Sequence, residues 1–245
     1  MTTLSAYALN FRGRLFPPLI SGGMGTNIST DRLALAIEKI GGIAHVSDAE
    51  LPDVCDRLFG TRFTAGKAKR FQALRTNSVK TEETFDLGAV REATLRYVGS
   101  LMERATGNGL LLINCMEKLT MNAGLETLKT RLNAALDAGI GGITLAAGLH
   151  LSSFRLMQEN KRFHDALLGI IVSSHRALNL FLRKSESTGR LPDYIVVEGP
   201  LAGGHLGFGM DWALHSLPAI VRQVKAYLAE KGLSIPVIAA GGIFT

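Results

Sequence analysis

The chain has 245 residues, of which 47% are hydrophobic and 20% are charged, and it carries a formal net charge of +6. This length fits one large α/β domain or two small ones. No apolar stretch reaches the length of a membrane span, and the first residues lack the basic and apolar regions of a secretion signal. The two cysteines, Cys55 and Cys115, lie far apart and indicate no disulfide framework, so a cytoplasmic location is expected.

Much of the positive charge lies in one segment, residues 62–80. A solvated loop or helix face is the more common reason for such a segment, and neither a recognition-helix pattern nor a zinc pattern accompanies it. Neither nucleic-acid binding nor a membrane partner is therefore expected. A non-catalytic binding protein that uses this basic segment stays open as a different class of function.

The chain begins with a strand pattern followed by a helix pattern. A short apolar run predicts a strand at 17–21, and a second strand is predicted at 43–47. Between them a helix is predicted at 30–42, with Thr30 or Asp31 as its N-cap. The apolar face of this helix is predicted to consist of Leu33, Ala36, Ile37 and Ile40.

The same alternation resumes after an irregular segment. Residues 48–86 are interpreted as helical pieces within a probable insertion. Beyond them, helical periodicity predicts helices at 85–107, 124–139, 175–189 and 216–232. Apolar, β-branched runs predict strands at 110–114, at 142–148, within 164–174, at 194–199 and at 235–242.

Continuous apolar strands that alternate with helices predict a parallel sheet covered by helices. A doubly wound dinucleotide-binding sheet would usually show G-x-G-x-x-G after its first strand, and residues 21–29 lack that spacing. Several strands end instead in glycine or polar residues, as at the carboxyl-terminal face of a barrel. We therefore predict a (β/α)8 TIM barrel over residues 1–245. Because only seven strands are counted, we expect the chain to lack the eighth strand and to be part of a longer polypeptide, or to close its sheet in another way.

Glycines gather where two of the predicted strands end. Such glycines let a ligand approach the backbone, and their N–H groups can surround a phosphate. Barrels commonly bind phosphate with the loops after strands seven and eight. A simple turn would explain either pair alone, but together they predict a phosphate site at Gly203, Gly204, Gly241 and Gly242.

His205 directly follows the first of these glycine pairs. A free imidazole has a pKa of about 6.5 and exchanges protons near neutral pH, so His205 is the candidate for chemistry. The alternative is a histidine that pairs with a loop carbonyl. The other histidines show no metal-ligand spacing, although His150 and His175 follow strand ends and are candidates to line a pocket. Cys115 is interpreted as a small buried residue rather than a nucleophile.

Four segments resemble the nitronate monooxygenases, formerly called 2-nitropropane dioxygenases: PPLISGGMG, LLINCM, VVEGPLAGGHLGF and IPVIAAGGIFT. The resemblance runs from about residue 17 to the end and is weakest over 48–109. These proteins are FMN-dependent TIM-barrel enzymes, and their superfamily includes FMN-dependent enoyl-acyl-carrier-protein reductases. Relatives commonly have Gln where Ser21 stands, which puts one contact of the first strand in doubt.

The resemblance implies roles for the matching residues. It places the backbone of Gly22, Gly23 and Met24 along the flavin ring and implies a hydrogen bond from Asn114 to the flavin. Ser173 or Ser174 would contact the cofactor. Glu198 would orient the loop that follows it, or simply cap the strand. The phosphate would bind the four glycines named above, Ala147 and Gly148 would lie on the substrate side, and His205 would act over the flavin as base or proton donor.

The implied reaction is the oxidation of alkyl nitronates by FMN and O2 to a carbonyl compound and nitrite. An enoyl reductase acting on a thioester, or another flavoenzyme that uses NAD(P)H, stays open as the alternative, because the glycine–histidine segment serves there too. No metal is implied, and a homo-oligomer is possible.

Overall fold

Six parallel strands form one curled sheet in the computed structural model, which describes residues 7–66, 86–117, 124–205 and 207–243. Their order in the sheet is their order in the chain, as in a TIM barrel, whereas a doubly wound sheet reverses direction at a switch point. The predicted barrel is therefore confirmed as a half-barrel consistent with a partial TIM barrel. The strands are β3 (Ile43–Ser47), β4 (Leu110–Met116), β5 (Gly142–Ala146), β6 (Leu167–Val172), β7 (Tyr194–Glu198) and β8 (Val237–Ala240).

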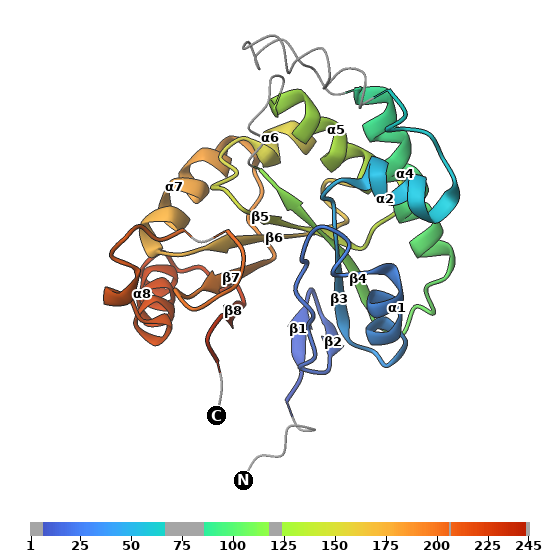
Figure 1. Cartoon of the computed structure of the whole chain (residues 1–245). Coiled ribbons are helices and arrows are strands. Elements are labelled where there is room, and N and C mark those ends of the chain that lie inside the picture. The colour runs from blue at the N-terminus through green and yellow to red at the C-terminus, as the bar shows by residue number, and fades with distance from the viewer. Residues whose placement is uncertain (1–6, 67–85, 118–123, 206, 244–245) are drawn as a thin grey trace.

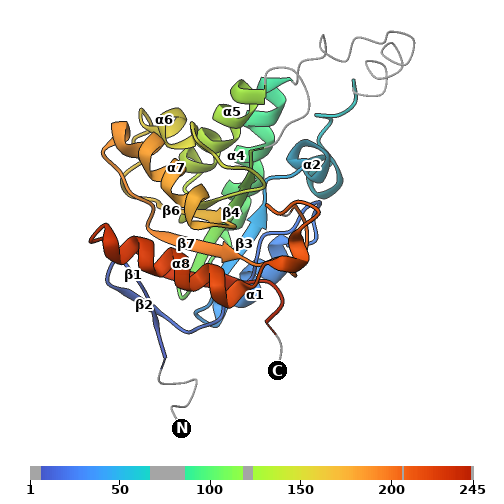
Figure 2. The same ribbon diagram turned by 90° about the vertical axis from the view of Figure 1, so that its left-hand side faces the viewer.

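Helices cover the outer face of this sheet and form an arc around it (Figure 1). The turned view shows α8 lying across the outside of β7 (Figure 2). Within the described residues, no helix is long and apolar enough to cross a membrane. The helices are α1 (Asp31–Lys39), α2 (Leu51–Phe59), α4 (Leu87–Glu103), α5 (Gly124–Asp137), α6 (Ser153–Met157), α7 (His175–Ser185) and α8 (Leu217–Glu230), with short 3-10 turns at Glu186–Thr188 and Trp212–Leu214.

The strand predicted at 17–21 is wrong as a full strand. Ile20 forms a single parallel bridge with Ile43, flanked by hydrogen bonds from Ser21 N to Ile43 O (3.0 Å) and from Ile43 N to Leu19 O (2.9 Å). The two prolines that precede Leu19 have no N–H to donate, so the ladder does not extend toward them. The segment nevertheless lies beside β3, where the first strand of a barrel would lie.

The buried face predicted for α1 is also wrong, although its N-cap is confirmed as Thr30, whose hydroxyl accepts a hydrogen bond from Leu33 N (3.2 Å). Leu33, Ala36 and Ile40 are exposed, whereas Ala34 and Glu38 are buried. Glu38 turns inward because its carboxylate accepts hydrogen bonds from Thr106 and Gly109 in the loop before β4. Burial opposes ionisation of Glu38, but these hydrogen bonds outweigh it and lower its pKa.

The irregular segment 48–86 is described in part. Its first section forms α2, as the helical-piece interpretation expects. Residues 67–85 lie outside the described residues, and with them most of the basic segment 62–80.

Side chains alternate between the two faces of the sheet, as the strand period requires. Outward residues such as Val46, Ile113 and Ile195 pack with the helices in the main hydrophobic core. Inward residues at the beginnings of the strands form a second, smaller cluster, which includes Ile43, Leu110, Leu112, Leu167 and Tyr194.

A β-hairpin that the sequence analysis missed completes this inner cluster. Strands β1 (Leu9–Phe11) and β2 (Arg14–Phe16) are antiparallel, and both turn residues, Arg12 and Gly13, have positive φ as a type I′ turn requires. Phe11 and Phe16 are buried, and Phe11 stacks on Tyr194 with ring centroids 5.0 Å apart. The hairpin therefore closes the amino-terminal end of the half-barrel.

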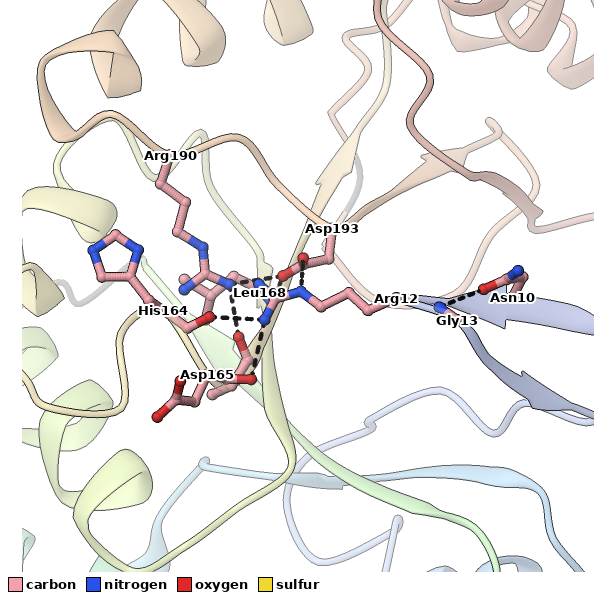
Figure 3. Close-up of polar contacts among 9 residues, drawn as sticks. Asn10, Arg12, Gly13, His164, Asp165, Leu168, Arg190 and Asp193 are labelled. Carbon is pink, nitrogen blue, oxygen red and sulfur yellow. Dashed lines mark hydrogen bonds and ion pairs between the residues drawn. The ribbon is translucent and has the colours of Figure 1, made fainter.

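Two arginines fasten the hairpin to the loops around it. Arg12 donates to Asp193 (Nε to Oδ1, 2.6 Å) and to the carbonyl of His164 (2.7 Å), while Arg190 approaches Asp193 from the other side (2.8 Å; Figure 3). Arg14 donates to three consecutive carbonyls of residues 107–109, in the loop whose N–H groups bind Glu38. The hairpin is thereby held at the starts of β4, β6 and β7.

We expect Arg12→Ala to lower the free energy of unfolding by about 2 kcal/mol, because a charge-assisted pair and a carbonyl contact are lost while Asp193 remains largely buried. Arg12→Lys should lose less, since it retains the charge but not the fork of donors. Arg91→Ala, which breaks an exposed pair with Asp137, is the control and should cost no more than about 0.5–1 kcal/mol. Urea unfolding measures all three, and equal losses at positions 12 and 91 would contradict the anchoring role.

Candidate active site

A cavity of about 970 Å³ lies inside the half-barrel, above the inner hydrophobic cluster. Its walls come from the ends of several strands and from the loops that follow them, as expected for the carboxyl-terminal face of a barrel. Eight residues predicted to form the site line this one cavity: Gly22, Gly23, Met24, Asn114, Ala147, Gly203, Gly204 and His205.

A second cavity, of about 380 Å³, adjoins the first. It is lined by the two remaining predicted residues of this region, Gly148 and Ser173. Glu198 and His205 line both cavities, so they stand where the two spaces meet.

Gly241 and Gly242 do not line either cavity. Both have positive φ, and a Cβ atom would lie 2.4 Å from Ala202 at Gly241 and 2.6 Å from Leu201 at Gly242. The turn after β8 thus packs on the turn after β7, which leads directly to Gly203 and Gly204. The structure brings the two predicted phosphate loops together, and their role in phosphate binding stays a prediction.

The segment Gly22–Met24 is held in place by two side chains. Ser29 donates through its hydroxyl to Gly22 O and accepts from Met24 N, both at 2.8 Å. Asn114 donates through Nδ2 to Gly23 O (2.9 Å), and a Cβ atom on Gly23 would lie 2.2 Å from the Cβ atom of Asn114. Asn114 therefore lines the cavity, and one of its donors is already used to position the glycine segment; its predicted hydrogen bond to the flavin stays a prediction.

A buried hydrogen-bonded chain that the sequence analysis missed crosses the floor of the large cavity. His45 contacts Ser21 O through Nδ1 (2.6 Å) and the Thr144 hydroxyl through Nε2 (2.7 Å), and Thr144 contacts the Tyr194 hydroxyl (2.5 Å). These side chains come from β3, β5 and β7, the alternate strands that share a layer inside a barrel.

The chemistry of these groups fixes the direction of each hydrogen bond. Ser21 O can only accept, so Nδ1 of His45 carries the proton. Burial lowers the pKa of His45 to about 4, so the ring is neutral and Nε2 accepts from Thr144. The single hydroxyl proton of Thr144 is then used, and Thr144 accepts from Tyr194. A polar residue at an inward position of an apolar strand, as in IAHVS, was the sequence signal for this network.

Three other residues singled out from the sequence, His150, His175 and Cys115, do not line either cavity. His150 is buried between Ser153 Oγ (2.8 Å) and Ala146 O (2.7 Å), and burial lowers its pKa to about 4. Neither His150 nor His175 is among the residues that line the two cavities. Cys115 is fully buried as expected, and burial raises the pKa of its thiol well above the ordinary value. Among the described residues, no group of three or more side chains has a metal-binding arrangement.

His205 is exposed and lies in a loop that is attached to the end of β6. The Ser173 hydroxyl donates to Gly207 O (3.2 Å), and a Cβ atom on Gly207 would lie 2.2 Å from Ser173 Oγ. Only glycine at position 207 permits this approach. Ser173 therefore helps to place the segment that carries His205.

Glu198 ends β7 on the inner face and is half-buried. Burial raises the pKa of its carboxyl to about 6. The boundary between the two cavities thus carries a carboxyl with a raised pKa, that of Glu198, and the imidazole of His205.

We expect Thr144→Val to lower the free energy of unfolding by about 2–4 kcal/mol, because it leaves both His45 Nε2 and the Tyr194 hydroxyl buried without a partner. Tyr194→Phe removes only one donor and should cost about 1 kcal/mol. Chemical denaturation measures both losses. Equal losses would contradict the direction of the chain.

Glu198→Gln should change how stability depends on pH. A raised carboxyl pKa means that the folded protein binds this proton more tightly than the unfolded chain, so the associated stability is present below about pH 4.5 and is lost as the pH rises through 6. The variant should therefore gain stability over the unaltered protein between these values, by at most about 1 kcal/mol because solvent screens a half-exposed group. Thermal unfolding across this range measures the difference, and a constant difference would contradict the raised pKa.

Comparison with known proteins agrees with the geometry. The family model described as nitronate monooxygenase matches residues 108–245, which is more than half of the chain. No curated protein matches the chain. The matched part runs from β4 through β8 and includes Asn114, Glu198 and His205. The chain therefore belongs to the nitronate monooxygenase family, whose members are flavin-dependent oxidoreductases.

Proposed function

We propose that this protein binds FMN in the large cavity and oxidises alkyl nitronates with O2, releasing a carbonyl compound and nitrite. The observation that carries the proposal is that residues of the region matched by the family model line one and the same cavity. The matched region supplies Asn114, Gly203, Gly204 and His205 to one cavity, whose other wall is the glycine segment at residues 22–24.

The residues present fit a flavin. The cavity lies within the range of about 300–1,000 Å³ that is usual for small-molecule and cofactor sites. Gly22 faces open space, since a Cβ atom there would meet nothing within 4 Å, and Gly203 and Gly204 have only Met24 nearby at 3.9 Å. Flat ring surfaces and phosphate oxygens can approach such a bare backbone closely.

FMN is proposed rather than a dinucleotide for two reasons. The segment after residue 21 lacks the dinucleotide fingerprint. Two neighbouring glycine turns would hold one terminal phosphate: residues 203–204, which line the cavity, and residues 241–242, whose turn packs against the residues just before them. The chemistry that a bound flavin would supply is the removal of electrons from the nitronate carbon and the transfer of these electrons to O2.

The protein's own contribution would be to position the substrate and the ring and to exchange a proton. The hydrogen-bonded chain from Tyr194 to His45 forms a neutral, fully engaged floor, so it offers no free proton at the base of the cavity. His205, which is exposed at the boundary between the two cavities, is the residue proposed to take the proton from a neutral nitroalkane. Asn114 and Ser29 fix the glycine segment against which the ring would lie.

We expect His205→Asn to retain FMN and to lose turnover of neutral nitroalkanes by a factor on the order of 10²–10⁴, the usual contribution of a positioned acid–base group. The loss with preformed nitronates should be smaller, because they need no proton removed. Steady-state oxygen consumption with both substrate forms measures the effect. His164→Asn, an exposed histidine at the opposite end of the half-barrel, is the matched control.

Equal losses on both substrate forms would show that His205 positions the substrate rather than moving protons.

Chromatography of the heat-released flavin tests the cofactor, and a major FAD peak would contradict FMN. Anaerobic mixing with NADH tests the reaction class. Rapid bleaching of the flavin would favour a reductase over the proposed oxidation.

A further inference from the structure

The smaller cavity lies over the carboxyl ends of β5, β6 and β7 and adjoins the larger one. Its lining is mainly aliphatic and small: Ala147, Leu149, Ile171, Val172 and Ala177. Val172 belongs to the core between sheet and helices, so this cavity extends outward over the end of β6 toward α7. It is a side compartment of the larger cavity.

Three polar side chains line this compartment, those of Ser173, Glu198 and His205. The hydroxyl proton of Ser173 is donated to Gly207 O (3.2 Å). Glu198 and His205, the ionisable side chains that line it, also line the large cavity. A molecule that spans both spaces would therefore meet the Glu198 carboxyl and the His205 imidazole at the junction and mainly aliphatic side chains beyond it.

We propose that the smaller cavity holds the alkyl chain of the nitronate and that Ala177 sets the length of chain it accepts. This inference rests on the proposed function and adds the orientation and size class of the substrate. The nitronate group would remain at the junction, beside His205, and the chain would point away from the large cavity into the space between β6 and α7.

The orientation follows from the chemistry of the two ends. A nitronate carries its negative charge on a planar NO2 group, and an unpaired charge is costly to bury among aliphatic side chains. The chain, by contrast, gains from burial, by about fourfold in affinity for each methylene removed from water.

Ala177 is the residue best placed to limit the chain. It lies in the first turn of α7, where the Ser174 hydroxyl accepts a hydrogen bond from its backbone N–H (3.1 Å). This N-cap fixes the backbone, so a larger side chain at position 177 would extend into the compartment rather than move away. Ala177→Leu should shorten the accepted chain, and Ala177→Gly should lengthen it.

The first experiment compares kcat/KM for linear nitronates from two to eight carbons. In the unaltered protein, kcat/KM should rise by about fourfold per methylene and then level off when the compartment is full. Ala177→Leu should level off at a shorter chain, with the two-carbon substrate unaffected, and Ala177→Gly at a longer one. Ala226→Leu, the same change at an exposed position of α8, is the control and should keep the original profile.

The second experiment does not depend on turnover. Linear carboxylates carry a planar anionic group like that of a nitronate, so calorimetry of acetate through octanoate measures the compartment directly. The chain length at which Kd stops improving should shift in the same two directions with the variants. If Ala177→Leu fails to retain flavin, the Ala177→Gly profile alone decides the question.

The outcomes separate the two proposals. Nitronate oxidation with a chain-length profile that neither variant at position 177 alters would overturn the compartment and leave the proposed function standing. Absence of nitronate oxidation by the unaltered protein, with a carboxylate profile that shifts in both directions, would overturn the function and leave an apolar compartment sized by Ala177. Flat binding across the carboxylate series would overturn the compartment.

Discussion

Tyr194 lies across the inside of the half-barrel, and the closure below it and the cavity above it both depend on its position. Its ring stacks on Phe11 of the hairpin, and its hydroxyl begins the chain through Thr144 to His45. The neighbouring strand makes room for it with Gly169, where a Cβ atom would lie 2.1 Å from the tyrosine ring. One aromatic side chain thus joins the hydrophobic closure to the polar floor.

The same chain connects the floor to the segment proposed to contact the flavin. His45 donates to Ser21 O, and residue 21 leads directly into Gly22 and Gly23. Glycine has the largest conformational freedom to lose, so a glycine segment stays in one conformation only if its neighbours hold it. Ser29 and Asn114 hold it from above and His45 from below. These hydrogen bonds hold the backbone of Gly22 and Gly23 in place although the two residues have no side chains of their own.

The sequence predicted those features that depend on local pattern. Apolar runs located all six strands of the sheet, and their alternation with helices predicted the barrel. The face of α1 could not be predicted, because Glu38 is turned inward by a loop almost seventy residues farther along the chain. The sequence did not indicate the hairpin, because its three-residue strands are too short to show a period. Its hydrogen-bond partners, Asp193 and the loop at residues 107–109, are also distant in sequence.

The histidines show why residue type alone is a weak guide to chemistry. His45, His150 and His205 all follow or occupy strands of the same sheet. In the first two, burial lowers the pKa to about 4, and both ring nitrogens are engaged, so neither can exchange protons with a ligand near neutral pH. Because the unfolded chain binds these two protons near pH 6.5 and the folded protein only near pH 4, the free energy of unfolding is highest above about pH 6.5 and falls as the pH drops toward 4. His205 has no such burial. The floor of the large cavity is therefore neutral because it is buried, whereas Glu198 and His205, which line both cavities, are the ionisable side chains closest to a ligand that spans them.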